Sequence, residues 1–313
     1  MPIRHLGYAC MNLSLTENVS KKDRIFTDRT LRQSGFSLER VGELAIQNSN
    51  DLLPILEWNH KNGIRFFRIG SGIFPFMDHP DIGYTLNDLS PSHRQAITAA
   101  LQRAGAFAKA HGLRLSCHPG PYTCLASPDS KIKDKSILSL NMHSMFADLL
   151  GYGQEFAINI HVGGVYEDKA QTAQRFCEAY SGLDEKLRNR LTLENDDKAS
   201  MWSITELYNM IWSCCGIKLV LDVHHHKFCR QESLHEAAAL AFSTWQGFTE
   251  IPKVHYSESK PDARPQAHSD YIQEPIPDLG DTVYDVMIEA KAKDLALLNY
   301  RKLCRDWRGT NAG

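Results

Sequence analysis

The stretch LVLDVHHHK, residues 219–227, places one aspartate and three histidines directly after an apolar run. Imidazole and carboxylate groups together, without thiolates, suit Zn²⁺, Mn²⁺ or Fe²⁺ better than Ca²⁺ or Mg²⁺. The chain also has 14 histidines in 313 residues, which is a high count and favours a metal hypothesis. Whether these groups meet at one site depends on the elements that carry them.

Short apolar, β-branched or aromatic runs predict eight strands, and stretches with helical periodicity separate them. Several of these helices close on glycine just before the next strand, as in HKNG followed by IRFF. This alternation predicts an α/β protein with a single (β/α)8 TIM barrel over residues 1–313. A doubly wound sheet is the alternative, weakened because no GxGxxG or GxxxxGK[ST] motif is present. The predicted strands are residues 3–9, 64–70, 113–118, 156–161, 191–195, 218–223, 252–257 and 283–289.

Functional residues of such barrels lie at the C-terminal ends of the strands. The predicted strands three to eight end at His118, His161, Glu194, Asp222, His255 and Glu289. Any one of these is more often a hydrogen-bonded core residue than a ligand, but their coincidence around one rim favours a site. His225 and the loop residue His268 extend the set to eight, which predicts two or three divalent ions bridged by Glu194 or Glu289. Such clusters are the usual machinery of phosphodiester hydrolysis.

Other histidines and the charge distribution carry less information. Alternation sends His224 and His226 to the opposite side from His225, where we expect them to be supporting or solvated. His79 lies in the loop after the second strand. The basic stretches KKDRIFTDRTLR and SKIKDK fall on the same rim as the candidate ligands. The net charge is only −2, so local basic groups and bound ions would have to hold a phosphate backbone.

Composition predicts a globular protein of the cytoplasm. Hydrophobic residues make up 42% of the chain, and the sequence contains no apolar run of eighteen residues and no secretory signal at MPIRHLGYAC. Eight cysteines are scattered without a CxxC pair, which favours reduced thiols over disulfides or a structural zinc site.

Nine motifs together resemble the UV damage endonuclease family, a branch of the barrels similar to endonuclease IV and xylose isomerase. The resemblance runs in order from about residue 3 to residue 303, and LENDDK and EAKAKDLALL are its most specific parts. The motifs are LGYACMN, RIGSGIFPF, SCHPGPYT, NIHVGGVYEDK, LENDDK, LDVHHH, KVHYS, AHSDYI and MIEAKAKDLALL.

The resemblance implies a DNA repair enzyme that nicks damaged duplex DNA immediately 5′ to cyclobutane pyrimidine dimers, 6-4 photoproducts and some abasic sites, leaving a 3′ hydroxyl. It implies Mn²⁺ at all eight candidate ligands, with Glu194, Glu289 and Lys253 as catalytic residues. Lys253 shares the inward face of His255, and a buried lysine beside metals should be neutral or chemically modified. We expect a monomer that acts on the nucleoid through DNA.

The same resemblance places Tyr8, Asn12 and His79 near the lesion. One departure concerns the loop after His118, where the family commonly has a glutamine followed by an aromatic residue that probe the duplex. Here these positions are Pro121 and Tyr122. Because proline lacks the hydrogen-bonding groups of an amide, lesion range and affinity are open to change.

Two alternatives remain at this stage. A sugar isomerase on the same barrel would need fewer ions and a compact polar pocket, which the basic rim loops disfavour. A damage-binding barrel without catalysis is disfavoured by the full ligand set, although Pro121 keeps it open. Cleavage of damaged duplex, turnover of an aldose, and binding without cleavage separate the three.

Overall fold

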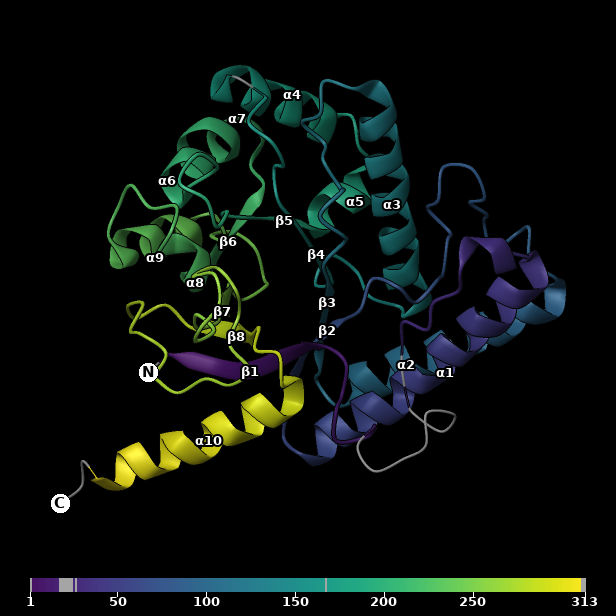
Figure 1. The fold of residues 1–313 in the computed structure, drawn as a ribbon, viewed down its shortest axis with the longest axis horizontal. Coiled ribbons are helices and arrows are strands. Elements are labelled where there is room, and N and C mark those ends of the chain that lie inside the picture. Colours follow the sequence, from purple (N-terminus) through teal and green to yellow (C-terminus); the bar gives the residue numbers. More distant parts are fainter. Residues whose placement is uncertain (1, 17–24, 26, 167, 311–313) are drawn as a thin grey trace.

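The computed structural model describes residues 2–16, 25, 27–166 and 168–310, except for the side chains of 306–310 (Figure 1). The basic stretch predicted at residues 21–32 lies in part outside these residues, at positions 21–24 and 26. The second predicted basic stretch, SKIKDK, forms the first turns of a helix.

Eight parallel strands close into a barrel in sequence order, with β8 pairing back onto β1. The predicted (β/α)8 barrel is therefore confirmed; seven strands lie within their predicted segments, and β1 extends one residue beyond its segment. The strands are β1 (Ile3–Cys10), β2 (Phe66–Ile69), β3 (Arg114–Cys117), β4 (Ala157–Ile160), β5 (Leu191–Glu194), β6 (Lys218–Asp222), β7 (Lys253–Tyr256) and β8 (Tyr284–Ile288).

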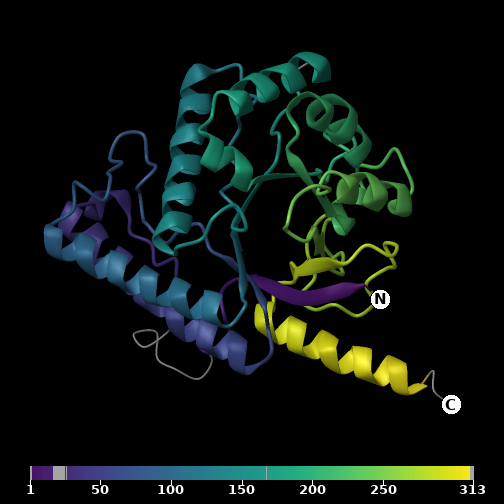
Figure 2. The same ribbon diagram turned by 180° about the vertical axis from the view of Figure 1, so that it is seen from behind.

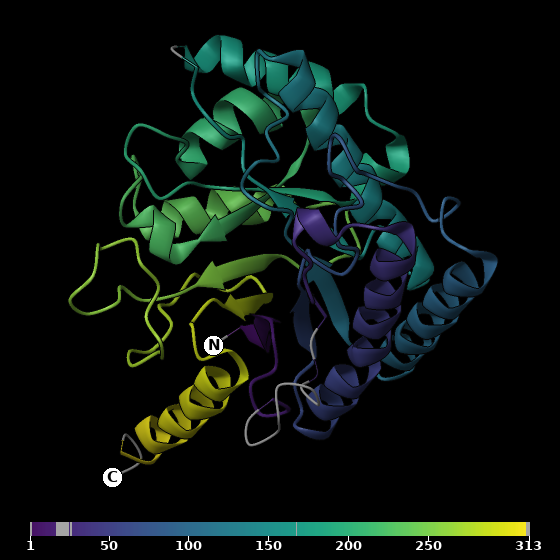
Figure 3. The same cartoon turned by 45° about the vertical axis from the view of Figure 1, so that its right-hand side comes forward.

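Helices surround the barrel. The view from behind shows α10 running along β1, and the turned view shows α1 and α2 packed side by side (Figures 2 and 3). None of the described helices has the length and apolarity needed to cross a membrane. The helices are η1 (Gln33–Gly35), α1 (Leu38–Lys61), α2 (Pro91–Ala110), α3 (Ser130–Leu149), α4 (Lys169–Ser181), α5 (Glu185–Arg190), α6 (Ile204–Glu206), η2 (Leu207–Trp212), α7 (Ser213–Cys215), α8 (Val223–His226), α9 (Leu234–Ser243) and α10 (Lys293–Thr310).

The boundaries of the long helices follow from local chemistry. Ser37 and Ser90 accept hydrogen bonds from backbone amides in the first turns of α1 and α2. Gly63 and Gly112 follow these helices with φ of 64° and 62°, a left-handed conformation that glycine adopts without strain. Each of these helices is thus stopped just before the strand that follows it, as the sequence predicts.

Side-chain alternation divides the barrel interior into layers. An apolar layer near the middle contains Ala9, Phe66 and Met287. Nearer the N-terminal ends of the strands, the fully buried Asp285 accepts hydrogen bonds from Arg4 at 2.9 and 2.6 Å and from Arg114 at 2.7 Å. This end of the barrel is closed by an ionic triad, and the opposite end is left for the candidate site.

Asp285→Asn is expected to lower the free energy of unfolding by about 3–5 kcal/mol, because the buried Arg114 guanidinium loses its carboxylate. Burial alone would raise the pKa of Asp285, but Arg4 and Arg114 hold it below its ordinary value. The stabilisation is therefore present above an unfolded pKa of about 3.9 and is lost as pH falls below it. Denaturant unfolding of wild type and variant from pH 7 to pH 3 measures this.

The exposed Asp281, in the loop before β8, provides the matched control as Asp281→Asn. A stability loss for Asp285→Asn no larger than that of this control at pH 7, or a loss that grows toward pH 3, would contradict the assignment.

Candidate metal centre

The C-terminal ends of the strands bring the predicted residues to one mouth of the barrel. Glu194 and Asp222 are the last residues of β5 and β6, and His255 lies within β7. The other three come directly after their strands: His118 after β3, His161 after β4 and Glu289 after β8. Strand-end position therefore predicted which side chains gather here.

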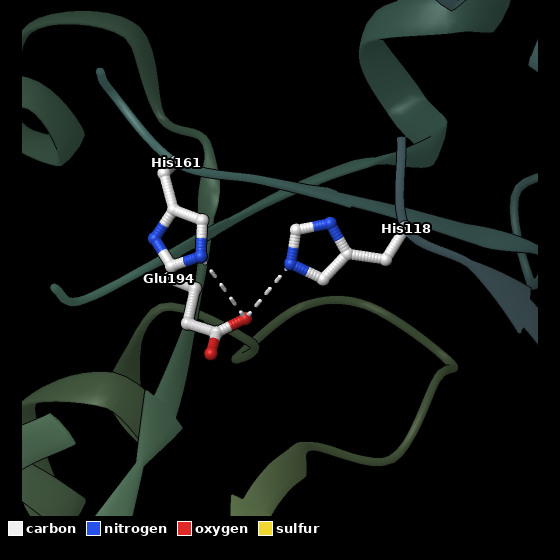
Figure 4. A group of neighbouring side chains, drawn as sticks. All are labelled: His118, His161 and Glu194. Carbon is white, nitrogen blue, oxygen red and sulfur yellow. Dashed lines mark ion pairs between the residues drawn. The ribbon is translucent and has the colours of Figure 1, made fainter. Parts of the chain in front are cut away.

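The first group of potential ligands consists of His118, His161 and Glu194, whose ligand atoms all lie within 4.8 Å of one another. Both imidazoles point at the same oxygen, with His118 Nε2 at 3.5 Å and His161 Nε2 at 4.0 Å from Glu194 Oε2 (Figure 4). The glutamate side chain is only 1% exposed, whereas the two histidines are partly open to the mouth. This group is thus accessible from solvent on the histidine side.

The second group consists of Glu194, Asp222, His255 and Glu289, again with ligand atoms within 4.8 Å of one another. His255 Nδ1 lies 3.0 Å from Glu194 Oε2 and 3.0 Å from Glu289 Oε1. Glu194 belongs to both groups, so it is placed to bridge them. The two groups could hold metal ions that share this carboxylate.

His225 and His268 flank the two groups. The Asp222 side chain accepts a hydrogen bond from the His225 backbone amide at 2.8 Å and so starts the short helix α8. That turn places His225 Nδ1 3.5 Å from Glu194 Oε1. His268 lies in the loop after β7, with its ring centroid 6.1 Å from that of His225. All eight predicted ligands are therefore neighbours.

The other two histidines of the opening stretch are buried. His224 Nε2 lies 3.3 Å from the backbone oxygen of Gln266, and His226 Nε2 lies 3.6 Å from Glu232 Oε1. They therefore pack as supporting residues behind the site, and the expectation that they could be solvated is not met.

Backbone carbonyls orient three of the candidate ligands. The Nδ1 atoms of His118, His225 and His268 lie 3.0, 2.9 and 2.9 Å from the carbonyl oxygens of Pro119, Asn195 and Glu289. Because a carbonyl only accepts, Nδ1 carries a hydrogen in each ring, and Nε2 is the nitrogen left to bind an ion. A histidine that binds a metal through Nε2 typically donates its Nδ1–H to a carbonyl or carboxylate in this way.

Charge at the site is held on the carboxylates. Burial alone would raise the pKa of Glu194, but His255 and His161 hold it well below its ordinary value. Burial also opposes ionisation of Glu289, whose pKa Arg68 and His255 hold low. His225 shows the complementary effect, because Asp222 and Glu194 outweigh its burial and raise its pKa to about 9. The ionised carboxylates thus favour a cation at this site. A bound metal ion would displace the proton from an imidazole nitrogen that becomes its ligand.

Three supporting residues escaped the sequence analysis. Asn159 donates a hydrogen bond to Glu194 Oε2, and Thr192 Oγ1 donates to Asn159 Oδ1 at 2.8 Å. Arg68 forms an ion pair with Glu289 Oε1. The signal was available, because Asn159 and Thr192 lie two residues before His161 and Glu194 and so share their inward face.

Lys253 lies beneath the site on the inward face of β7. The residue is 1% exposed, and its Nζ has no hydrogen-bond partner among the described residues. Burial, followed by the charge of Arg114, lowers the pKa of Lys253 to about 7. The amine is therefore partly uncharged near pH 7, whereas an ordinary lysine would be fully charged there.

The donors present fit a transition-metal site. They combine imidazole nitrogens with carboxylate oxygens and include no thiolate. Buried Asp222 Oδ2 and His255 Nε2 also lack a hydrogen-bond partner within the described part of the chain. Buried polar atoms without a partner are costly, so a bound cation would satisfy groups that the protein leaves open.

Two of the residues predicted to lie near the lesion are fully buried. The Tyr8 hydroxyl donates to Asn59 Oδ1 at 2.7 Å and accepts from Asn12 Nδ2 at 2.8 Å. This chain of hydrogen bonds ties β1 and the loop after it to α1. Tyr8 and Asn12 therefore make structural contacts in the interior, and neither is exposed to a DNA partner in this structure.

The other three predicted lesion contacts lie in loops. His79 is half-buried, and its Nδ1 accepts from the backbone amides of Asp81 and Ile82 at 3.1 and 3.4 Å. Pro121 and Tyr122 are exposed in the loop between β3 and α3, and 82% of Tyr122 is accessible. Among the residues that the structure describes at this rim, Tyr122 is the aromatic residue most open to a partner.

Comparisons with known proteins agree with the resemblance read from the motifs. A model of the family described as UV-endonuclease UvdE matches residues 4–312. The UV-damage endonuclease of Schizosaccharomyces pombe is 37% identical across 98% of this chain and 51% of its own length. The UV DNA damage endonuclease of Bacillus thuringiensis is 30% identical across 98% of this chain and 96% of its own.

A solved structure extends the agreement to three dimensions. The crystal structure of SacUVDE has a TM-score of 0.83 to this chain at 30% identity, and the match covers 97% of this chain and 99% of that one. The chain spans about half the length of the Schizosaccharomyces protein but nearly the whole of the Bacillus protein and of SacUVDE.

Proposed function

The chain belongs to the UV-endonuclease family, and from this we propose that it is a metal-dependent endonuclease that incises DNA immediately 5′ to UV photoproducts. Its substrates are duplexes with cyclobutane pyrimidine dimers or 6-4 photoproducts, and abasic sites, and its product carries a 3′ hydroxyl. It acts as a monomer on chromosomal DNA in the cytoplasm. The observation that carries the proposal is the pair of ligand groups joined by Glu194 at the barrel mouth.

We propose two or three Mn²⁺ ions for the eight candidate ligands. Bound ions would supply Lewis-acid stabilisation of the charge that develops on the phosphate and on the leaving oxygen. Their ligands would be His118, His161, Glu194, Asp222, His225, His255, His268 and Glu289.

The chain's own contribution is to hold the carboxylates ionised and in place. Asn159 fixes Glu194, and Arg68 fixes Glu289, so both acids are oriented before substrate arrives. Lys253 supplies an amine of low basicity in the layer below, close enough to Glu194 for the negative charge of that carboxylate to act on it. We therefore assign Glu194, Glu289 and Lys253 as the catalytic residues.

The rim beside the site supplies groups for DNA. Tyr122 comes four residues after His118, and α3 opens on Lys131 and Lys135, which are exposed. An exposed aromatic ring stacks on an unpaired base, and lysines contact phosphates without regard to sequence. Selectivity for a dimer follows because a poorly stacked lesion costs little to extrude.

Tyr122→Ala is expected to weaken binding to a thymine-dimer duplex about 5- to 150-fold, since a stacked base contributes about 1–3 kcal/mol. The rate of incision at saturating enzyme should change little, because the ligand groups are untouched. Fluorescence anisotropy with a catalytically silent metal and single-turnover incision separate the two effects.

Phe248 provides the control, as an aromatic residue 40% exposed just before β7, at the opposite end of the barrel. Equal affinity of Tyr122→Ala and Phe248→Ala for damaged duplex would remove Tyr122 from the interface.

The function itself is tested by mapping the nick. Duplexes with one thymine dimer, one 6-4 photoproduct or one abasic site, and an undamaged duplex, are incubated with the protein and Mn²⁺. The proposal predicts a single cut 5′ to each lesion with a 3′ hydroxyl that a polymerase extends. Binding without cleavage on all three, with the protein shown to contain metal, would overturn it.

A further inference from the structure

His161 differs from the other oriented histidines in the group that faces its Nδ1 atom. His118, His225 and His268 each have a backbone carbonyl there, at 2.9–3.0 Å. His161 Nδ1 instead lies 3.4 Å from Oδ1 of Asp196, a carboxylate two residues beyond Glu194. A carboxylate in this position is a stronger acceptor than a carbonyl because it carries charge.

The Asp196 residue is held in place, and the His161 Nδ1 atom that faces it has no other partner among the described residues. The side chain of Asp196 is 13% exposed, and its backbone amide donates to the carbonyl of Trp202 at 3.0 Å. Within the described residues, His161 Nδ1 and Asp196 Oδ2 have no hydrogen-bond partner. A small rotation of the ring closes the 3.4 Å gap to a hydrogen bond, and the opposite nitrogen then faces Glu194 (Figure 4).

We propose that Asp196 is a positioning residue that accepts the Nδ1–H of His161 and keeps the Nε2 lone pair of that ring directed at the ion held with His118 and Glu194. The inference rests on the proposed metal-dependent function and goes beyond it. Asp196 strengthens the binding of the ion at the first group. The ligands that belong to the second group alone, which are Asp222, His255 and Glu289, keep their own contacts.

The tautomer is tested first, because it needs no metal. Asp196→Asn keeps the size of the side chain but offers an amide that can donate to Nδ1, which permits hydrogen on Nε2 instead. Long-range ¹H–¹⁵N spectra of the metal-free protein should show His161 protonated on Nδ1 in wild type and shifted toward Nε2 in the variant. Asp197→Asn, at the half-buried neighbouring position, should match wild type.

Mn²⁺ binding is measured next, by calorimetry and by electron paramagnetic resonance. Asp196→Asn should lose about 10- to 100-fold in affinity at one class of site, as outer contacts to metal ligands typically contribute, with the other class unchanged. Unchanged affinity and an unchanged tautomer would overturn the inference, as would an equal loss at every site with a lower Tm. If wild type itself binds no Mn²⁺, the proposed function fails instead.

Discussion

Glu194→Gln is expected to reduce the rate of incision at a thymine dimer by about 10³-fold or more. Glu194 is the carboxylate common to both ligand groups, and it contacts His118, His161 and His255 through one oxygen. The glutamine amide lacks the negative charge of the Glu194 carboxylate, which faces all three of these histidines. Loss of several kcal/mol of transition-state stabilisation corresponds to this factor.

The measurement is single-turnover incision of a 5′-labelled duplex, together with the Mn²⁺ content of each protein. Glu57→Gln on the exposed side of α1 is the matched control and should incise at the wild-type rate. If Glu194→Gln retained more than a tenth of the wild-type rate with bound metal unchanged, Glu194 would not be the bridging carboxylate.

Lys253→Met is expected to stabilise the metal-free protein while abolishing incision. The lysine amine is 1% exposed and has no hydrogen-bond partner among the described residues. Replacing a buried unsatisfied polar group by an apolar one of similar length should add about 1–3 kcal/mol to the free energy of unfolding. Thermal and denaturant unfolding measure the gain, and the incision assay measures the loss of activity.

A second buried lysine supplies the contrast. Lys218 is 4% exposed, but its Nζ donates to the carbonyl of Asn189 at 3.0 Å and pairs with Glu250 at 3.6 Å. Lys218→Met should therefore destabilise the protein, since it leaves Glu250 without its cation. If both variants destabilised the protein alike, the Lys253 side chain would be stabilised by a partner or by a covalent modification. The claim that it is buried without a partner would then be wrong.

Much of the fold was predictable because the barrel repeats one local pattern. Each predicted strand overlaps an observed strand, and Gly63 and Gly112 stop α1 and α2 as predicted. In a barrel, the C-terminal ends of all strands lie at the same face. The positions of His118, His161 and Glu194 at predicted strand ends were therefore enough to predict that these residues lie close together.

The sequence analysis missed two kinds of feature. One kind depends on backbone that leaves the strand pattern of alternating side chains, and the other involves residue types that were not considered as site residues. The alternation argument for His224 and His226 did not anticipate α8, whose start depends on the Asp222 side chain bonding to the His225 amide. Arg68 was overlooked because only acidic residues and histidines were sought at strand ends. The hydrogen-bond roles of Tyr8 and Asn12 depend on α1, which is remote in sequence and so could not be read from either residue's neighbourhood.

The central claim is that the ligand groups joined by Glu194 hold ions that cut DNA beside UV lesions. The most direct measurement strips the protein with a chelator, confirms by circular dichroism that it remains folded, and follows incision of a duplex with one thymine dimer as Mn²⁺ is returned. The account predicts no cut without metal and a single cut 5′ to the dimer once two or three ions are bound per chain. A cut by the stripped protein, or no cut by the reloaded one, would contradict it.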